Sequence, residues 1–152
     1  MTIRKATIEY IDTIHRLGQS VDEFRVNEET VNFWPKELLT RAVQSDDVLL
    51  LVAEDKEIQG FLIVNYNRSL KKGLIENIYV HPDHRGQGIG DQLISHMFEL
   101  LPDMGCEYVA TLVPPDALGA LDLYTRNGFN QGEQFVWLDR SLDDSFKRKA
   151  TP

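Results

Sequence analysis

The chain of 152 residues, of which 42% are hydrophobic and 26% charged, suits one globular domain with one core. Its formal net charge of −8 argues against nucleic acid as a partner, because binding nucleic acid requires a basic surface. The single cysteine, Cys106, excludes an internal disulfide, and no segment resembles a signal peptide or a membrane span, so we expect a cytoplasmic protein without a membrane partner.

The first third of the chain predicts a strand followed by two helices. Residues 2–6 are typical of a short strand, and Thr7 can cap the helix after it. Four apolar residues of that helix share one face: Ile8, Ile11, Ile14 and Leu17. Pro35 interrupts the next stretch, and residues 37–44 then predict a second helix.

Three strands are predicted next, and two of them form a hairpin. The apolar runs 48–54 and 58–66 are joined by a polar turn at residues 55–57, which is the pattern of a hairpin. A second turn, around residues 68–73, leads into a third strand at residues 74–80.

A helix after Gly90 and another strand follow. The helix has an apolar face that we expect to be buried: Leu93, Ile94, Met97, Phe98 and Leu101. Pro102 ends the helix. Residues 106–113 predict the strand, and we expect Cys106 to be a buried residue of it rather than a nucleophile.

The last part of the chain predicts one more helix and one more strand. Asp116 can cap a helix to about residue 127, with Gly128 at its C-terminal end, and residues 135–142 predict the strand. Residues 143–152 carry no pattern and are expected to be a mobile tail. The element order implies one domain, residues 1–142, with a mixed sheet and helices on its faces.

A glycine-rich turn carries the chemistry. A strand ends at Val80, and Gly86, Gly88 and Gly90 then open an amphipathic helix. Glycines let the backbone approach a ligand, and the first amides of a helix lack internal partners and lie at its positive end. With Arg85 beside them, these amides predict a site for phosphate oxygens.

Three phosphate-binding patterns can be compared with this turn. The mononucleotide P-loop requires Lys and Ser or Thr after its last glycine, whereas Asp91 and Gln92 follow here. The dinucleotide fingerprint differs in glycine spacing and belongs early in a β-α-β unit. The third pattern is Arg-x-x-Gly-x-Gly directly after a strand. Arg85, Gly88 and Gly90 fit this pattern, and the strand before them ends Tyr-Val-His-Pro.

The segments IRKATIEYIDTI, HRGQGIG and ALDLYTRNGF, in this order, resemble the GNAT superfamily of acyl-CoA-dependent N-acetyltransferases, and the resemblance covers most of the chain. It implies an α/β (α+β) fold, with a mixed, mostly antiparallel sheet of six or seven strands flanked by about four helices. It also implies an enzyme that moves an acetyl group from acetyl-CoA to a primary amine by direct attack in a ternary complex. A non-catalytic acyl-CoA-binding or regulatory module, or transfer of a different acyl group, is the alternative.

The resemblance assigns roles to individual residues. Ile78, Tyr79 and Val80 would pair with the pantetheine arm, and the Val80 N–H would polarise the thioester carbonyl. The pyrophosphate would be held by Arg85, Gly86, Gln87, Gly88, Ile89 and Gly90. Tyr124 would be the acid that protonates the departing thiolate.

Two positions depart from the family pattern. Ala117 stands where the family often has an asparagine that contacts the cofactor, which weakens that contact. Leu112 stands where enzymes of the ribosomal-protein N-terminal type have a glutamate. The base of that subgroup therefore cannot be assigned to this chain.

Glu76 is the first candidate for the base that takes a proton from the amine. It lies four residues before Val80, so strand alternation predicts both on one face. A solvated strand residue without a role is an equal alternative. His81 alternates to the other face, and His84 is expected to shape the loop.

The stretch 21–30 has four acidic residues and one arginine, and in this family such a region often lines the acceptor groove. The residues expected to attract and enclose a cationic amine are Asp22, Glu23, Glu28, Glu29, Phe24, Phe33 and Trp34. An ordinary solvated helix face is the alternative. No cluster has metal-ligand spacing, so we expect no metal, and edge strands favour a homodimer.

Overall fold

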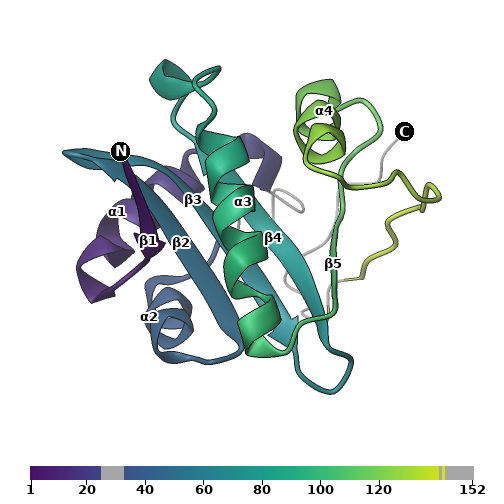
Figure 1. Ribbon diagram of the computed structural model, residues 1–152, viewed down its shortest axis with the longest axis horizontal. Helices are drawn as coiled ribbons and strands as arrows, with labels where there is room; N and C mark the ends of the chain where they lie inside the picture. Colours follow the sequence, from purple (N-terminus) through teal and green to yellow (C-terminus); the bar gives the residue numbers. More distant parts are fainter. Residues whose placement is uncertain (25–32, 141, 143–152) are drawn as a thin grey trace.

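The structure is a computed structural model that describes residues 1–24, 33–140 and 142. A five-stranded sheet in the order β1-β2-β3-β4-β5 runs through its centre (Figure 1). The strands are β1 (Thr2–Lys5), β2 (Val48–Asp55), β3 (Glu57–Asn67), β4 (Lys72–Val80) and β5 (Tyr108–Thr111). Neighbouring strands are antiparallel, except that β4 and β5 are parallel.

Four α-helices of the described residues cover the two faces of the sheet (Figure 1). They are α1 (Ile11–Gln19), α2 (Lys36–Gln44), α3 (Ile89–Leu100) and α4 (Leu118–Arg126). Single 3₁₀ turns lie at Ile8–Tyr10, Asp22–Phe24, Pro82–His84 and Pro102–Met104.

Alternate residues of β2 and β3 face two separate apolar cores. Leu50 and Phe61 pack with α1 and α2, whereas Leu51 and Leu62 pack with α3 and with Tyr124 of α4. A strand with a core on each side must be apolar at nearly every position. This requirement explains the unbroken apolar runs that predicted the hairpin.

Most predicted elements are confirmed, because their signals are local. The hairpin closes at Lys56, whose φ of 66° makes the turn tight. The 3₁₀ turn that begins at Pro102 follows the end of α3, and Gly128, with φ of +89°, follows the end of α4.

The predicted strand at residues 135–142 is wrong for the described part of that segment. Residues 135–140 form no strand, so the sheet of the described residues has five strands and not six or seven. The segment has strand composition, but pairing also requires a neighbouring edge in register. The segment 143–152 lies outside the described residues.

Three smaller expectations are also wrong. Phe98 is 41% exposed and lies beside Phe129 rather than inside the core. Cys106 is half-buried and precedes the strand, with its Sγ 3.2 Å from the carbonyl oxygen of Tyr108. Asp116 does not cap α4, because the helix begins two residues later behind Ala117.

A polar contact joins the start of α3 to the end of α4. Arg126 donates from Nε and Nη2 to the two carboxylate oxygens of Asp91, at 2.8 and 3.0 Å. Asn127 donates from Nδ2 to Asp91 Oδ1 at 2.7 Å. Arg126, chiefly, and Asn127 lower the pKa of the Asp91 carboxyl from 3.8 to about 2. Leu123 packs against Gly90 beside this contact.

Replacing Arg126 by methionine should destabilise the protein only modestly at pH 7, since both partners are partly exposed and water screens the pair. The folded state lowers the pKa of Asp91, so this contribution is complete above 3.8 and is lost as the pH falls through about 2. The difference in Tm between wild type and Arg126→Met should therefore be about 2–4 °C at pH 7 and should shrink in acid, as thermal denaturation can measure.

Lys71→Met is the matched control, because Lys71 pairs with Glu107 at 3.3 Å through one exposed contact. It should change the Tm by less than Arg126→Met at every pH. Equal Tm values for wild type and Arg126→Met at pH 7 would show that the contact adds nothing to stability.

Candidate active site

Strands β4 and β5 run together for only part of their length. They pair from Lys72 with Tyr108 to Ile75 with Thr111, and Thr111 Oγ1 donates to the Ile75 carbonyl oxygen at 3.1 Å. No pair joins residues 76–80 of β4 to the described chain after Thr111. We call the point where the two strands part the fork.

A β-bulge lies at the fork. Opposite β3, Asn77 pairs with Ile63 and Ile75 pairs with Val64, so Glu76 is an extra residue of β4. Such a residue bends the strand and breaks its alternation. Glu76 accepts a hydrogen bond from Asn65 Nδ2 at 3.0 Å.

The expectation that Glu76 and Val80 share a face is therefore wrong. Val80 packs in the core beside α3, and Val64 belongs to the same core. Because side chains alternate along a strand, Asn65, the residue after Val64 in β3, points to the opposite face of the sheet. The Glu76 carboxylate lies with Asn65 on the face of α1 and α2, and its residue is exposed.

The glycine-rich turn folds back onto the end of β4. Arg85 Nε donates to the Val80 carbonyl oxygen at 3.0 Å. Gly86 and Gly88 have φ of +76° and +79°, the left-handed region that a side chain disfavours. A Cβ at either glycine would have no atom within 4 Å, so the space beside this backbone is open.

Helix α3 begins directly after this turn, with Gly88 as its N-cap. The first helical bond runs from the Gln92 N–H to the Gly88 carbonyl, so the amides of Ile89, Gly90 and Asp91 have no partner within the helix. His81 caps the preceding 3₁₀ turn, its Nδ1 accepting from the Asp83 N–H at 3.2 Å. The unpaired amides can donate hydrogen bonds to an anionic oxygen, and the open glycines leave room for it.

Tyr124 of α4 lies at the fork, on the face of α3. It is 5% exposed, and its ring meets the Phe129 ring edge to face at 5.1 Å. Burial raises the pKa of the Tyr124 hydroxyl, an effect that a hydrogen bond with Thr111 opposes. Because Thr111 also bonds to Ile75, the phenol lies beside the last paired residues of the two strands.

The opposite face of the fork carries aromatic residues. Rings are in contact in series from Phe24 to Phe33, Phe61 and Tyr79, with neighbouring centroids 5.2–5.7 Å apart. Trp34 joins this group, since its Nε1 donates to Asn77 Oδ1 at 3.0 Å. Phe24 and Trp34 are thus brought to the side of the sheet that holds Glu76, whereas Glu28 and Glu29 lie outside the described residues.

Three contacts of this region have little signal in the sequence. They are the Trp34–Asn77 hydrogen bond, the link from Tyr124 through Thr111 to Ile75, and the Asp91–Arg126 pair. Each joins residues far apart in the chain. Only the bulge had a signal, because two polar residues in succession, Glu76 and Asn77, break the alternation of an apolar strand.

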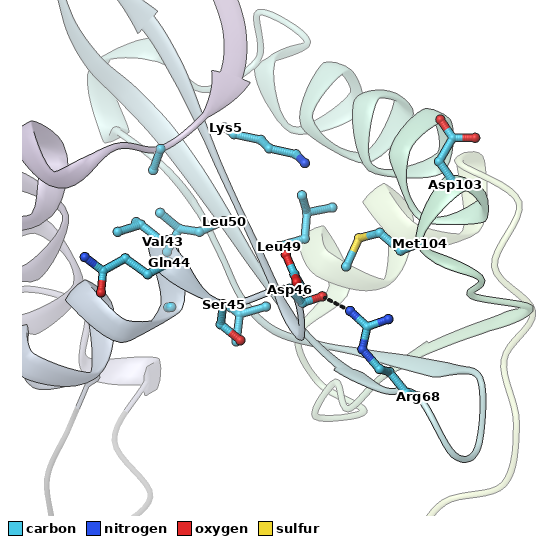
Figure 2. A pocket seen from close by; sticks show the side chains of 13 residues that line it. Lys5, Val43, Gln44, Ser45, Asp46, Leu49, Leu50, Arg68, Asp103 and Met104 are labelled. Atoms are coloured by element: carbon cyan, nitrogen blue, oxygen red, sulfur yellow. Dashed lines mark hydrogen bonds between the residues drawn. The ribbon is translucent and has the colours of Figure 1, made fainter.

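A cavity of about 370 Å³ lies elsewhere, lined by the end of α2, the start of β2 and the Pro102–Met104 turn (Figure 2). That turn follows the C-terminal end of α3, so the helix separates the cavity from the glycine-rich turn. Its arginine, Arg68, already bonds to Asp47 Oδ1 at 2.6 Å and to the Asp46 carbonyl oxygen at 3.1 Å. The fork, where unpaired backbone groups converge, is the stronger candidate.

Two features are absent from the residues that the structure describes. No three or more His, Cys, Asp or Glu side chains are grouped so that they could hold a metal ion. None of the helices combines the length and the apolar character needed to cross a bilayer.

Two curated proteins are similar to this chain over part of its length. Thialysine N-epsilon-acetyltransferase of Bos taurus is 35% identical over 74 residues, which cover 47% of this chain and 44% of that protein. Streptothricin acetyltransferase of Streptomyces lavendulae is 33% identical over 91 residues, 60% of this chain and 46% of that protein. The chain thus spans less than half the length of these relatives.

A solved structure and a family model extend the likeness to the whole fold. The aminoglycoside N-acetyltransferase AAC(6')-Iy, in complex with CoA, superposes with a TM-score of 0.73 at 18% identity, over 92% of this chain and 99% of that one. The model of the acetyltransferase (GNAT) family matches residues 15–129, which include the fork, the glycine-rich turn and Tyr124. The chain belongs to the GNAT family of acetyltransferases.

Proposed function

We propose that this protein transfers an acetyl group from acetyl-CoA to a primary amine, by direct attack while both are bound, in the cytoplasm. The observation that carries the proposal is the fork, where an unpaired strand edge lies between a helix start without a side-chain cap and a buried tyrosine. An extended ligand with an anionic end and a reactive carbonyl fits this arrangement.

The cofactor would lie along the free edge of β4. A pantetheine arm has amide groups that can pair with Ile78, Tyr79 and Val80 as an added strand would. Its pyrophosphate would be held by the unpaired amides and the open glycines from Arg85 to Gly90. The Val80 N–H would then polarise the thioester carbonyl, where negative charge develops during attack.

The chemical step requires one base and one acid. The amine nitrogen attacks the thioester carbonyl carbon, the carbon–sulfur bond breaks, and the product is an acetamide. Glu76 takes the amine proton, directly or through water, and Tyr124 donates a proton to the departing thiolate. Burial raises the pKa of Tyr124, which favours a phenol that is still protonated when the thiolate leaves.

The acid and the base lie on opposite faces of the sheet, with the fork between them. This supports a reaction in which the cofactor enters from the side of α3 and α4 and the amine from the side of α1 and α2. Phe24 and Trp34 would form walls of the acceptor pocket, and Glu28, outside the described residues, stays a candidate from the sequence. The net charge of −8 and the acidic stretch 21–30 favour a cationic acceptor, as do relatives named for thialysine and streptothricin.

Gly88→Ala tests the phosphate site. A Cβ at φ of +79° costs about 1–2 kcal/mol, so the turn should leave this conformation and CoA should bind about 10-fold more weakly in calorimetry. Gly132→Ala is the control, because Gly132 has no positive φ and open space around it. A wild-type protein that ignores millimolar CoA would refute the proposal itself.

Tyr124→Phe should lower kcat about 100-fold and leave the Kd for CoA nearly unchanged, because only the proton donor is lost. The ring keeps its contact with Phe129, so folding should be retained. Tyr66→Phe, at another buried tyrosine, should have little effect. Turnover can be measured as thiol release with a panel of amines. A Tyr124→Phe variant that turns over at the wild-type rate would reject the acid role.

Glu76→Gln should lower kcat/KM about 100-fold near neutral pH, because the protonated amine then has no base. Activity should recover as the pH approaches the pKa of the amine, where the free amine is abundant. Glu57→Gln changes an exposed carboxylate of β3 and should follow the wild-type pH profile. Overlapping profiles of Glu76→Gln and wild type would assign the proton transfer to water.

A further inference from the structure

The bulge of β4 places two consecutive side chains on the same face of the sheet. Ile75 pairs with Val64, which belongs to the core under α3. Asn77 pairs with Ile63, which belongs to the core under α1 and α2. Directly opposite residues of an antiparallel pair share a face, so Asn77 lies on the face where Glu76 also lies. A regular strand would send one of these two neighbours to the opposite face.

The indole of Trp34 determines how the Asn77 amide is turned. An indole N–H can only donate, so the atom that accepts from it at 3.0 Å must be the amide oxygen, Oδ1. The amide NH2 group, Nδ2, then faces away from the indole. Trp34 is held from its other end as well, because His15 Nδ1 lies 3.0 Å from its carbonyl oxygen. The orientation of the Asn77 amide is thus set from α1 and from the chain just before α2.

The NH2 group of Asn77 has no hydrogen-bond partner among the described residues. Asn77 is half-buried, and every fully buried side-chain nitrogen or oxygen of the described chain has a partner. The NH2 group must therefore be reachable from solvent. Its neighbour Glu76 accepts from Asn65 through Oε1, which leaves Oε2 available. One donor and one acceptor thus lie side by side on this face of the fork.

We propose that Asn77 binds the acceptor, and that the acceptor is an amine with a neutral carbonyl group on the neighbouring carbon. This inference rests on the proposed function and names the class of its substrate. The carbonyl oxygen accepts from Asn77 Nδ2 while the amine nitrogen lies at Glu76 Oε2. Amino and carbonyl groups on neighbouring carbons are found in an amino-acid amide and at a peptide N-terminus.

Spacing and charge favour this class of acceptor. Consecutive Cα atoms are about 3.8 Å apart, so Glu76 and Asn77, on one face, can reach the nitrogen and the oxygen of one small group. A free carboxylate bound to Asn77 would lie beside the Glu76 carboxylate, and like charges so close repel each other. A neutral carbonyl avoids this repulsion, and the protonated amine carries the positive charge that an acidic protein attracts. A simple alkylamine would leave the Asn77 donor without a partner.

Alaninamide and isopropylamine are a matched pair of acceptors, because they differ only in a carboxamide or a methyl group beside the carbon that bears the amine. The kcat/KM for each is measured at one pH as thiol release from acetyl-CoA. The ratio of the two values is then compared between enzymes, so that intrinsic differences between the amines cancel.

Asn77→Asp should lower the ratio of alaninamide to isopropylamine at least about 10-fold. The variant keeps the oxygen that accepts from Trp34 and exchanges the donor for a carboxylate oxygen. Trp34→Phe should lower the ratio about 2-fold, because the released amide can turn over and only one of its two orientations offers the donor. This second variant decides the question if circular dichroism shows that Asn77→Asp is unfolded.

Asn67→Asp is the control, since Asn67 Oδ1 also accepts one hydrogen bond, from the Leu70 N–H at 3.1 Å, at the far end of β3. It should keep the wild-type ratio. A folded Asn77→Asp protein with the wild-type ratio overturns this inference and leaves the proposed function standing, whereas a wild type that acetylates no amine overturns both. A wild type that prefers alanine to alaninamide also overturns the inference, because a carboxylate is then bound. Alanyl-alaninamide separates the two sources: a higher kcat/KM than for alaninamide assigns a peptide N-terminus, and a lower one an amino-acid amide.

Discussion

The parting of β4 and β5 is the constraint on which the rest of the site depends. The strands separate after Ile75 and Thr111, where Glu76 is inserted as an extra residue opposite β3. The bulge bends β4 at the point where the short β5 ends. Polar groups of a strand edge inside a fold need partners, and an extended amide ligand can supply them without any strand moving.

Each side of the fork is supported by its own core. The packing of α3 and α4 holds the glycine-rich turn and Tyr124, and the packing of α1 and α2 holds Trp34 and the aromatic series. The two cores are separated by the sheet itself. Residues on the second side can therefore change with the acceptor while the first side is preserved, which suits a family whose members act on different amines.

What the sequence predicted, and what it did not, follows from the range of each interaction. The glycine-rich turn and the start of α3 were predictable because positive φ and free helix amides depend on neighbouring residues. The face of Glu76 was not, because two successive polar residues indicate an irregular strand but the position of the bulge depends on the register of the partner strand. Residues 135–140 have the composition of a strand, yet composition alone does not bring a segment into register with a strand edge.

The Asp91–Arg126 pair has a consequence for anions that approach α3. A lone carboxylate in the first turn of this helix would repel a phosphate group from the amides of Ile89 and Gly90. Because Arg126 donates two hydrogen bonds to it, the pair acts as a small dipole whose field decays faster than that of a single charge. The net charge of −8 would slow an approaching anion, whereas this pairing leaves the attraction of the helix amides for an anion largely intact.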